Sequence, residues 1–122
     1  MSRVLVIDDD AMMATQMETI LGHHGHEVKA VRSVEAALFA LEPDNYDLVI
    51  VDVFMGGIGG LDGIVEFRDW GWAMPIISTS AGYREIAADT ALDAAGKIGA
   101  NGVLPKPFTP TELKARVEQA LI

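Results

Sequence analysis

Short, unbroken apolar runs alternate with segments of helical periodicity along the whole chain. The clearest runs are residues 4–7, 48–51 and 76–77, with weaker ones at 28–31 and 103–104. Apolar runs without polar alternation are typical of strands that are covered on both faces, as in a parallel sheet between two layers of helices. The pattern therefore predicts five buried strands.

Apolar residues recur at helical spacing after each of these runs. Their main positions are Met13, Met17, Ile20 and Leu21; Val34, Ala37, Leu38 and Leu41; Leu61, Ile64 and Val65; the Ala-rich segment 86–98; and Leu113, Val117, Ala120 and Leu121. The order is strand then helix, five times over. Right-handed crossovers turn that order into an α/β fold, a (βα)5 doubly wound five-stranded parallel sheet of flavodoxin-like type, and we expect residues 1–122 to form one domain.

Several residues are placed to begin or end these helices. Asp10 and Ser33 are candidate N-caps for the first and second helices, and Gly22 and Gly71 stand where the first and third are expected to end. The last helix has the fullest signature, because Thr-Pro-Thr-Glu at 109–112 gives a cap, a proline at the first helical position and a capping box.

Charge and composition exclude several classes of function. Lys and Arg total 9 against 18 Asp and Glu, for a net charge of −9, so nucleic-acid binding and binding to an anionic membrane surface are disfavoured. The chain has no cysteine, which excludes disulfides, thiolate metal sites and a cysteine nucleophile. It begins with an acidic segment and has no apolar stretch of membrane-spanning length. We expect a cytoplasmic protein.

Acidic and hydroxyl side chains follow the predicted strands. Asp8 and Asp9 come after the first strand and Asp52 after the third, while residues 78–80 (Ser-Thr-Ser) follow the fourth and Lys106 follows the fifth. Parallel strands deliver such residues to one edge of the sheet, where α/β folds bind their ligands. Carboxylates that lie close together repel one another, so at neutral pH they need a cation or raised pKa values. Hard oxygen ligands in a partly open site suit Mg²⁺.

Asp52 can act as a carboxylate nucleophile at such a site if a metal draws charge from an incoming phosphoryl group. Lys106 supplies a point charge for one anionic oxygen, and Ser80 can donate a hydrogen bond to another. This combination predicts an acyl phosphate on Asp52.

Four segments carry a resemblance to a known family: VLVIDDD, DLVIVDVFM, PIISTSAG and GANGVLPKPF. In this order and close to these spacings, the chain resembles the receiver domain of bacterial two-component response regulators, with the CheY-like fold. The resemblance covers nearly the whole chain. It implies a phosphorelay function, in which a histidine kinase or phosphotransfer protein donates a phosphoryl group and the altered surface binds a downstream protein. The chain would be a signalling protein and not an enzyme.

The resemblance also implies roles for single residues. Asp52 matches the phosphoacceptor, Asp9 a direct Mg²⁺ ligand, and Asp8 the acid that usually acts through water. The backbone carbonyl of Phe54 would complete the metal site. Ser80 matches the switch hydroxyl and Lys106 the phosphate-binding lysine, and the Lys106–Pro107 bond is expected to be cis.

The chain also departs from the family pattern. Gly56 stands where the family has a proline after the acceptor loop's methionine, and Val103 occupies the position of the aromatic switch residue, which Tyr83 could replace. These departures motivate an alternative function, a degenerate receiver that binds partners without phosphorylation. A phosphatase of the haloacid dehalogenase type is a further alternative, but Met12 stands where its D-x-D-x-T pattern needs threonine.

Other residues have simpler interpretations. The histidines at 23, 24 and 26 lie in a Gly-flanked segment, which favours a solvated turn over a metal site. For Trp70 and Trp72, on either side of Gly71, packing is the first interpretation and a partner surface the second.

Overall fold

The computed structural model describes residues 2–40, 42–53, 60–80 and 101–121. Along the chain the elements are β1 (Arg3–Ile7), α1 (Ala11–His23), β2 (Glu27–Val31), α2 (Val34–Ala40), the short 3-10 helix η1 (Pro43–Asn45), β3 (Leu48–Asp52), α3 (Gly60–Asp69), β4 (Ile76–Ser80), β5 (Gly102–Pro105) and α5 (Pro110–Ala120). The Ala-rich segment 86–98, expected to be a helix, lies outside the described residues.

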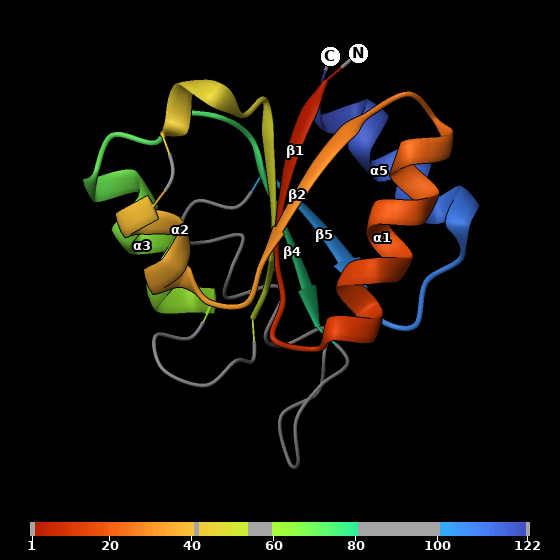
Figure 1. The fold of residues 1–122 in the computed structure, drawn as a ribbon, viewed down its shortest axis with the longest axis horizontal. Coiled ribbons are helices and arrows are strands. Elements are labelled where there is room, and N and C mark those ends of the chain that lie inside the picture. The colour runs from red at the N-terminus through yellow and green to blue at the C-terminus, as the bar shows by residue number, and fades with distance from the viewer. Residues whose placement is uncertain (1, 41, 54–59, 81–100, 122) are drawn as a thin grey trace.

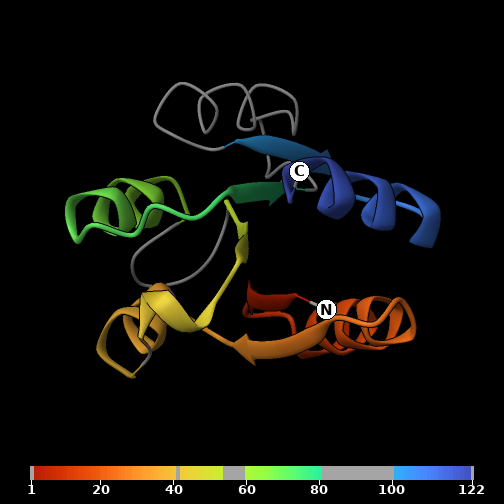
Figure 2. The ribbon, with the colours of Figure 1, turned by 90° about the horizontal axis from the view of Figure 1, so that it is seen from above.

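The strands form one parallel sheet in the order β2-β1-β3-β4-β5 (Figure 1). Two layers of helices cover it, α1 and α5 on one face and α2 and α3 on the other (Figure 2). This is the predicted doubly wound parallel sheet. Its strand order reverses beside β1 and β3, and their carboxyl ends are therefore the expected ligand site.

The core has two halves, one on each face of the sheet, and each strand contributes to both. In β1, Leu5 and Ile7 pack toward α2 and α3, whereas Val4 and Val6 pack toward α1 and α5. All five residues of β3 are buried. The unbroken apolar runs thus did indicate strands enclosed on both faces, since alternate side chains of one strand enter different halves of the core.

The predicted helix caps are present. Asp10 Oδ1 accepts hydrogen bonds from the backbone N–H groups of Met12 and Met13, and Ser33 Oγ accepts one from Ala36. Thr109 and Glu112 form the predicted capping box at the start of α5. These bonds satisfy backbone donors that the first turn of a helix leaves without partners.

The first helix extends beyond Gly22, the residue at which it was predicted to end. Gly22 is still helical, and α1 continues to His23. The residue that reverses the chain is Gly25, whose φ of 86° lies in the left-handed region that glycine adopts without strain. The backbone N–H of His26 donates a hydrogen bond to the carbonyl of Leu21, which closes this turn. The end of a helix depends on which glycine takes the left-handed conformation, and helical periodicity does not distinguish the two.

A glycine allows α2 and α3 to pack closely. Gly63 is buried, and a Cβ atom built there would lie 2.6 Å from Cγ2 of Val34. Any larger residue would push the two helices apart, so the sequence needs glycine inside a helix despite its cost of about 1 kcal/mol relative to alanine. In the same half of the core, Phe67 stacks on Trp72 with ring centroids 4.6 Å apart.

Arg68 and Asn101 tie the end of α3 to the starts of β4 and β5. Arg68 Nη1 donates to the carbonyls of Trp72 and Met74, at 2.7 and 2.8 Å. Its Nη2 donates to Asn101 Oδ1, which also accepts from the backbone N–H of Ile76. Burial lowers the pKa of Arg68 from its usual value, but the guanidinium stays charged at neutral pH.

Replacing Asn101 with alanine should lower the free energy of unfolding by about 1 kcal/mol, because the N–H of Ile76 and one Arg68 donor lose their shared acceptor. Urea denaturation would measure the loss. The matched control is Gln16→Ala on the exposed face of α1, expected to change the unfolding free energy by less than about 0.5 kcal/mol. Equal effects of the two substitutions would show that the Asn101 bonds contribute nothing.

Candidate functional site

Asp8 and Asp52 lie side by side at the carboxyl ends of the two central strands. Ile7 of β1 pairs in register with Val51 of β3, so the residue that follows each one reaches the same edge of the sheet. Asp8 is 1% exposed and Asp52 8% exposed. The backbone N–H of Asp8 donates to the carbonyl of Val31, which fixes the chain as it leaves the sheet.

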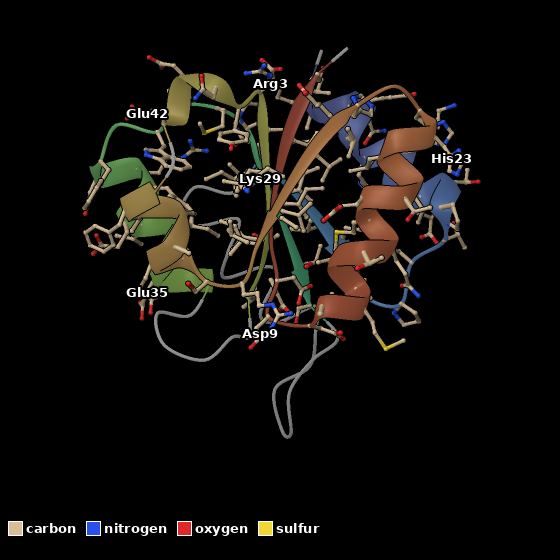
Figure 3. All side chains as sticks on the ribbon, in the orientation of Figure 1. Arg3, Asp9, His23, Lys29, Glu35 and Glu42 are labelled. Carbon is tan, nitrogen blue, oxygen red and sulfur yellow. The ribbon has the colours of Figure 1, made fainter. Side chains whose placement is uncertain are left out.

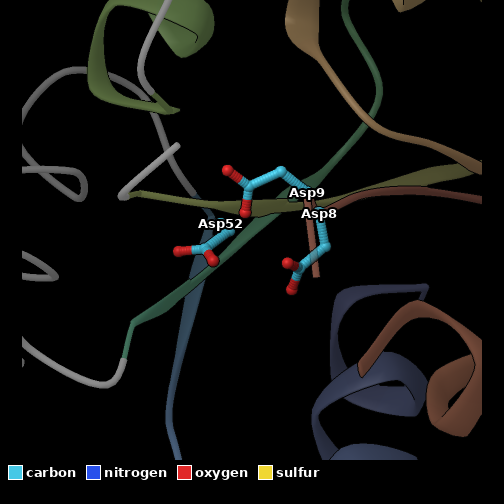
Figure 4. Close-up of side chains that lie close together, drawn as sticks. All are labelled: Asp8, Asp9 and Asp52. Atoms are coloured by element: carbon cyan, nitrogen blue, oxygen red, sulfur yellow. The ribbon is translucent and has the colours of Figure 1, made fainter. Parts of the chain in front are cut away.

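Asp9 completes a group of three carboxylates (Figure 4). Asp8, Asp9 and Asp52 each offer one oxygen, and these oxygens lie within 4.8 Å of one another. Asp9 is exposed, so the group opens to solvent on one side. Among the residues that the structure describes, this is the group of acidic and histidine side chains close enough to hold a metal ion together. It brings together the three predicted acids, while Phe54, the fourth predicted ligand, lies outside the described residues.

The donor atoms of this group fit a hard divalent cation. All are carboxylate oxygens, the ligands that Mg²⁺ prefers, and the exposed side leaves room for the waters that Mg²⁺ retains. Two of the three carboxylates are buried, which increases the cost of their mutual repulsion. The acidic group therefore fits Mg²⁺.

Lys106 supplies the positive charge in this structure. Its Nζ lies 2.9 Å from Asp8 Oδ2 and 3.1 Å from Asp52 Oδ2, and its side chain is only 10% exposed. Burial by itself lowers the pKa of Lys106, but the hydrogen bonds and negative charges of Asp8 and Asp52 outweigh burial and raise that pKa above its usual value. Lys106 is therefore a firmly protonated bridge between the two buried acids.

The backbone around Lys106 aims its side chain at the acids. The Lys106–Pro107 peptide bond is cis, as predicted. The backbone N–H of Lys106 donates to the carbonyl of Ser80 at 2.9 Å, which continues the pairing of β4 with β5 to the edge of the sheet. Ser80 and Lys106 are thus held next to each other through the main chain.

The sequence analysis placed three hydroxyl residues after the fourth strand. In the structure they are the last three residues of that strand. Ser78, Thr79 and Ser80 belong to β4 and are fully buried. Within the part of the chain that the structure describes, the hydroxyl oxygens of Ser78 and Thr79 are buried without a hydrogen-bond partner. The prediction failed because the apolar run stops at Ile77, whereas the backbone pairing continues, with Asp52 opposite Thr79.

Asp8 holds more of the site than the sequence indicated. Its Oδ1 accepts a hydrogen bond from the backbone N–H of Asp10 at 2.9 Å, and its Oδ2 accepts from Lys106. Asp10 in turn caps α1. The acid at the end of β1 thereby connects the start of α1 to the lysine that follows β5. In the sequence, only the run of acids at 8–10 indicated such a connection. The run does not show that Asp8 is the acid that binds both the backbone of Asp10 and the ammonium of Lys106.

The histidines and Val103 do not belong to this group of acids. His23 and His24 are exposed at the opposite end of α1 from Asp10, and His26 is half-buried, as a turn requires (Figure 3). Val103, at the position of the aromatic switch, is partly buried against the core. Gly56 and Tyr83 lie outside the described residues.

The chain matches the model of a known protein family over most of its length. Residues 4–118 match the model of the response regulator receiver domain. The chain belongs to this family. It is the receiver domain of a two-component response regulator, a signalling protein and not a classical enzyme, and a receiver implies a partner histidine kinase.

Individual relatives agree with this assignment. The two-component response regulator PhoP of Pseudomonas aeruginosa is 35% identical over 119 residues, which cover 98% of this chain and 51% of PhoP. The response regulator MprA of Mycolicibacterium vanbaalenii is 33% identical, over 98% of this chain and 50% of MprA. The chain thus spans about half the length of the curated relatives it matches.

A solved structure gives the same result for the fold. The receiver domain of the Francisella response regulator 1452 superimposes with a TM-score of 0.85 at 27% identity, over 99% of this chain and 97% of that one. None of the helices in the described part of this receiver is both long and apolar enough to cross a membrane.

Proposed function

We propose that this receiver accepts a phosphoryl group on a carboxylate oxygen of Asp52, from a histidine kinase or a phosphotransfer protein. The observation that carries the proposal is the position of Asp52, which lies buried at the end of β3 with Lys106 on one oxygen and two further acids beside it. A carboxylate held in this way is oriented for attack and next to a cation.

We further propose that Asp9 and Asp52 bind Mg²⁺ directly, that Asp8 acts through water, and that the carbonyl of Phe54 completes the site. Both oxygens of Asp8 already accept hydrogen bonds, which favours the indirect role. When bound, the metal supplies positive charge that offsets the repulsion between the acids and the phosphoryl group.

In the proposed reaction, an Asp52 oxygen forms a bond to phosphorus while the bond from phosphorus to the donor histidine nitrogen breaks. The bonding electron pair stays on that nitrogen, and the donor imidazole leaves. Lys106 Nζ then pairs with a phosphoryl oxygen in place of the Asp52 oxygen it holds now. Lys106 enters this step as an ammonium, since Asp8 and Asp52 raise its pKa.

The switch that we propose begins at Ser80. Its hydroxyl would donate to another phosphoryl oxygen, and its carbonyl already accepts from the backbone N–H of Lys106. A movement of Ser80 is therefore transmitted to β5 and to the segments around it, shifting the population between two surfaces for a downstream protein.

We place this reaction in the cytoplasm, where ATP-derived phosphoryl donors occur, and propose that residues 1–122 act as one domain.

Intact mass spectrometry tests the proposal. Incubation with Mg²⁺ and acetyl phosphate should add one phosphoryl group, and chelation of the metal with EDTA should prevent the addition. Reduction of the acyl phosphate with borohydride converts the labelled aspartate to homoserine, so peptide sequencing identifies the acceptor. An adduct on any residue other than Asp52 would contradict the assignment. No adduct on folded protein with excess donor would favour the phosphorylation-independent binding module.

A further inference from the structure

Two aromatic side chains are exposed together on the α2–α3 layer. Phe39 near the end of α2 is 78% exposed, and Trp70 just after α3 is 51% exposed. Their rings meet edge to face, with centroids 5.7 Å apart and planes at 87°. We call Phe39 and Trp70 the aromatic pair.

The pair is not needed to fill the core. On this face of the sheet the buried aromatic residues are Phe67 and Trp72, which stack on each other. The aromatic pair gains the modest energy of an edge-to-face contact but leaves a large apolar area in water. Large aromatic residues exposed side by side are typical of an interaction surface, and tryptophan is the residue most enriched at binding hot spots.

Apart from Arg68, the charged residues of α2 and α3 and of the segment just after α2 are acidic. Glu66 and Asp69 lie in the last turn of α3, and Glu66 precedes Trp70 by one turn. Glu42 lies three residues after Phe39 and is exposed. Arg68 is the only base in the sequences of α2 and α3, and its guanidinium is bound to Trp72, Met74 and Asn101.

This combination selects among occupants. A second copy of the chain would bring the same acids against these, and an anionic membrane would be repelled as well. A partner segment that offers an apolar side chain flanked by Lys or Arg would fill the aromatic contact and neutralise the acids, with cation–π contacts to Trp70 available.

We propose that the aromatic pair and its acidic surround form a docking surface for a cationic amphipathic segment of a partner protein. The carboxyl ends of α2 and α3 lie at the end of the sheet away from the phosphorylation site, as the positions of Glu42 and Asp9 show (Figure 3). Docking at this surface leaves the acids of the site accessible, so it does not depend on phosphorylation and can hold a partner in both states.

Titration with a synthetic helical peptide of leucine and lysine tests this surface. Amide chemical shifts should change around residues 39 and 70 when the peptide is added, and the same peptide with glutamate in place of lysine should not bind. The Phe39→Ala/Trp70→Ala variant should bind the lysine peptide about tenfold more weakly, as expected when a hot spot is truncated. The matched control is Met12→Ala, which removes an exposed apolar side chain (75% exposed) from α1 and should leave the affinity unchanged.

Two further measurements keep the proposal open to refutation. If the double variant does not fold, Phe39→Ala alone and Glu66→Gln/Asp69→Asn should each weaken binding while retaining the thermal unfolding transition. Equal affinity of wild type and all variants would mean that the peptide binds net charge alone, and the docking surface would be refuted. Self-association in sedimentation that the double variant abolishes would also overturn it, in favour of a second copy as the occupant.

Discussion

Asp52→Asn should take up no phosphoryl group under conditions that label the wild type completely. The amide has nearly the shape of the carboxylate and can still accept a hydrogen bond from Lys106, but it carries no charge and is not a nucleophile. Intact mass after incubation with Mg²⁺ and acetyl phosphate measures the difference. Because Asp8, Asp9 and Lys106 remain, loss of the adduct would show that the carboxylate of Asp52 is required, and the homoserine formed from the wild type identifies it as the acceptor.

The matched control is Asp10→Asn, which removes an adjacent acid and keeps an equally good cap for α1. This variant should be labelled like the wild type. In EDTA, Asp52→Asn should also be more stable than the wild type, by about 1 kcal/mol, since one of three neighbouring carboxylates is gone. Labelling of the Asp52→Asn protein would mean that another residue, such as Asp9, accepts the phosphoryl group.

Most of the sheet could be predicted from the sequence because burial on both faces leaves an unmistakable pattern. Residues 4–7 and 48–51 are apolar throughout since alternate side chains enter both halves of the core. The end of β4 does not show this pattern. Ser78 and Thr79 are buried yet polar, so hydropathy placed them beyond the strand although the backbone pairing includes them.

The acids of the site could also be predicted, because strand order alone brings Asp8 and Asp52 to one edge. The bonds of Lys106 could not. That Lys106 binds a phosphoryl oxygen once Asp52 is phosphorylated stays a prediction, and the sequence did not indicate that its ammonium binds Asp8 and Asp52 in this structure. A lysine carries no information about which of several neighbouring carboxylates it will satisfy, since that choice depends on distances of a few tenths of an ångström.

The sequence also did not show which of the two tryptophans is buried and which is exposed. Packing was the first interpretation for both, and it holds for Trp72, which stacks on Phe67. Between them, Gly71 adopts a φ of 84°, and this reversal turns Trp72 into the core while Trp70 stays on the outside. Helical periodicity cannot assign either ring, because the helix has ended before the chain turns.

Lys106→Met should lower the free energy of unfolding by about 2 kcal/mol in EDTA, because two buried acids lose the ammonium that both of them bind. Mg²⁺ should recover more stability in this variant than in the wild type, since it would be the sole cation left at the acids. The rate of phosphoryl uptake should fall by about 100-fold, the usual effect of removing one charged donor from a transition state.

The matched control is Lys114→Met, which removes a surface lysine whose contact with Glu118 is long, at 3.8 Å. It should change neither the uptake rate nor, by more than about 0.5 kcal/mol, the free energy of unfolding. An unchanged uptake rate in Lys106→Met would remove Lys106 from the proposed reaction, whatever its effect on stability.

The pH dependence separates the charge of Lys106 from its packing. The pKa of Lys106 is raised in the folded protein, so the folded state holds this proton more tightly than the unfolded state does. Its contribution to stability is then fully present below the pKa of an unfolded lysine, near about 10.4, and is lost as the pH rises through the folded pKa. The stability difference between wild type and Lys106→Met should therefore stay constant from about pH 7 to about pH 10 and shrink above that range. Urea denaturation across this range measures it. A difference that persists unchanged at the alkaline end would mean that the alkyl chain of Lys106, and not its ammonium, stabilises the site.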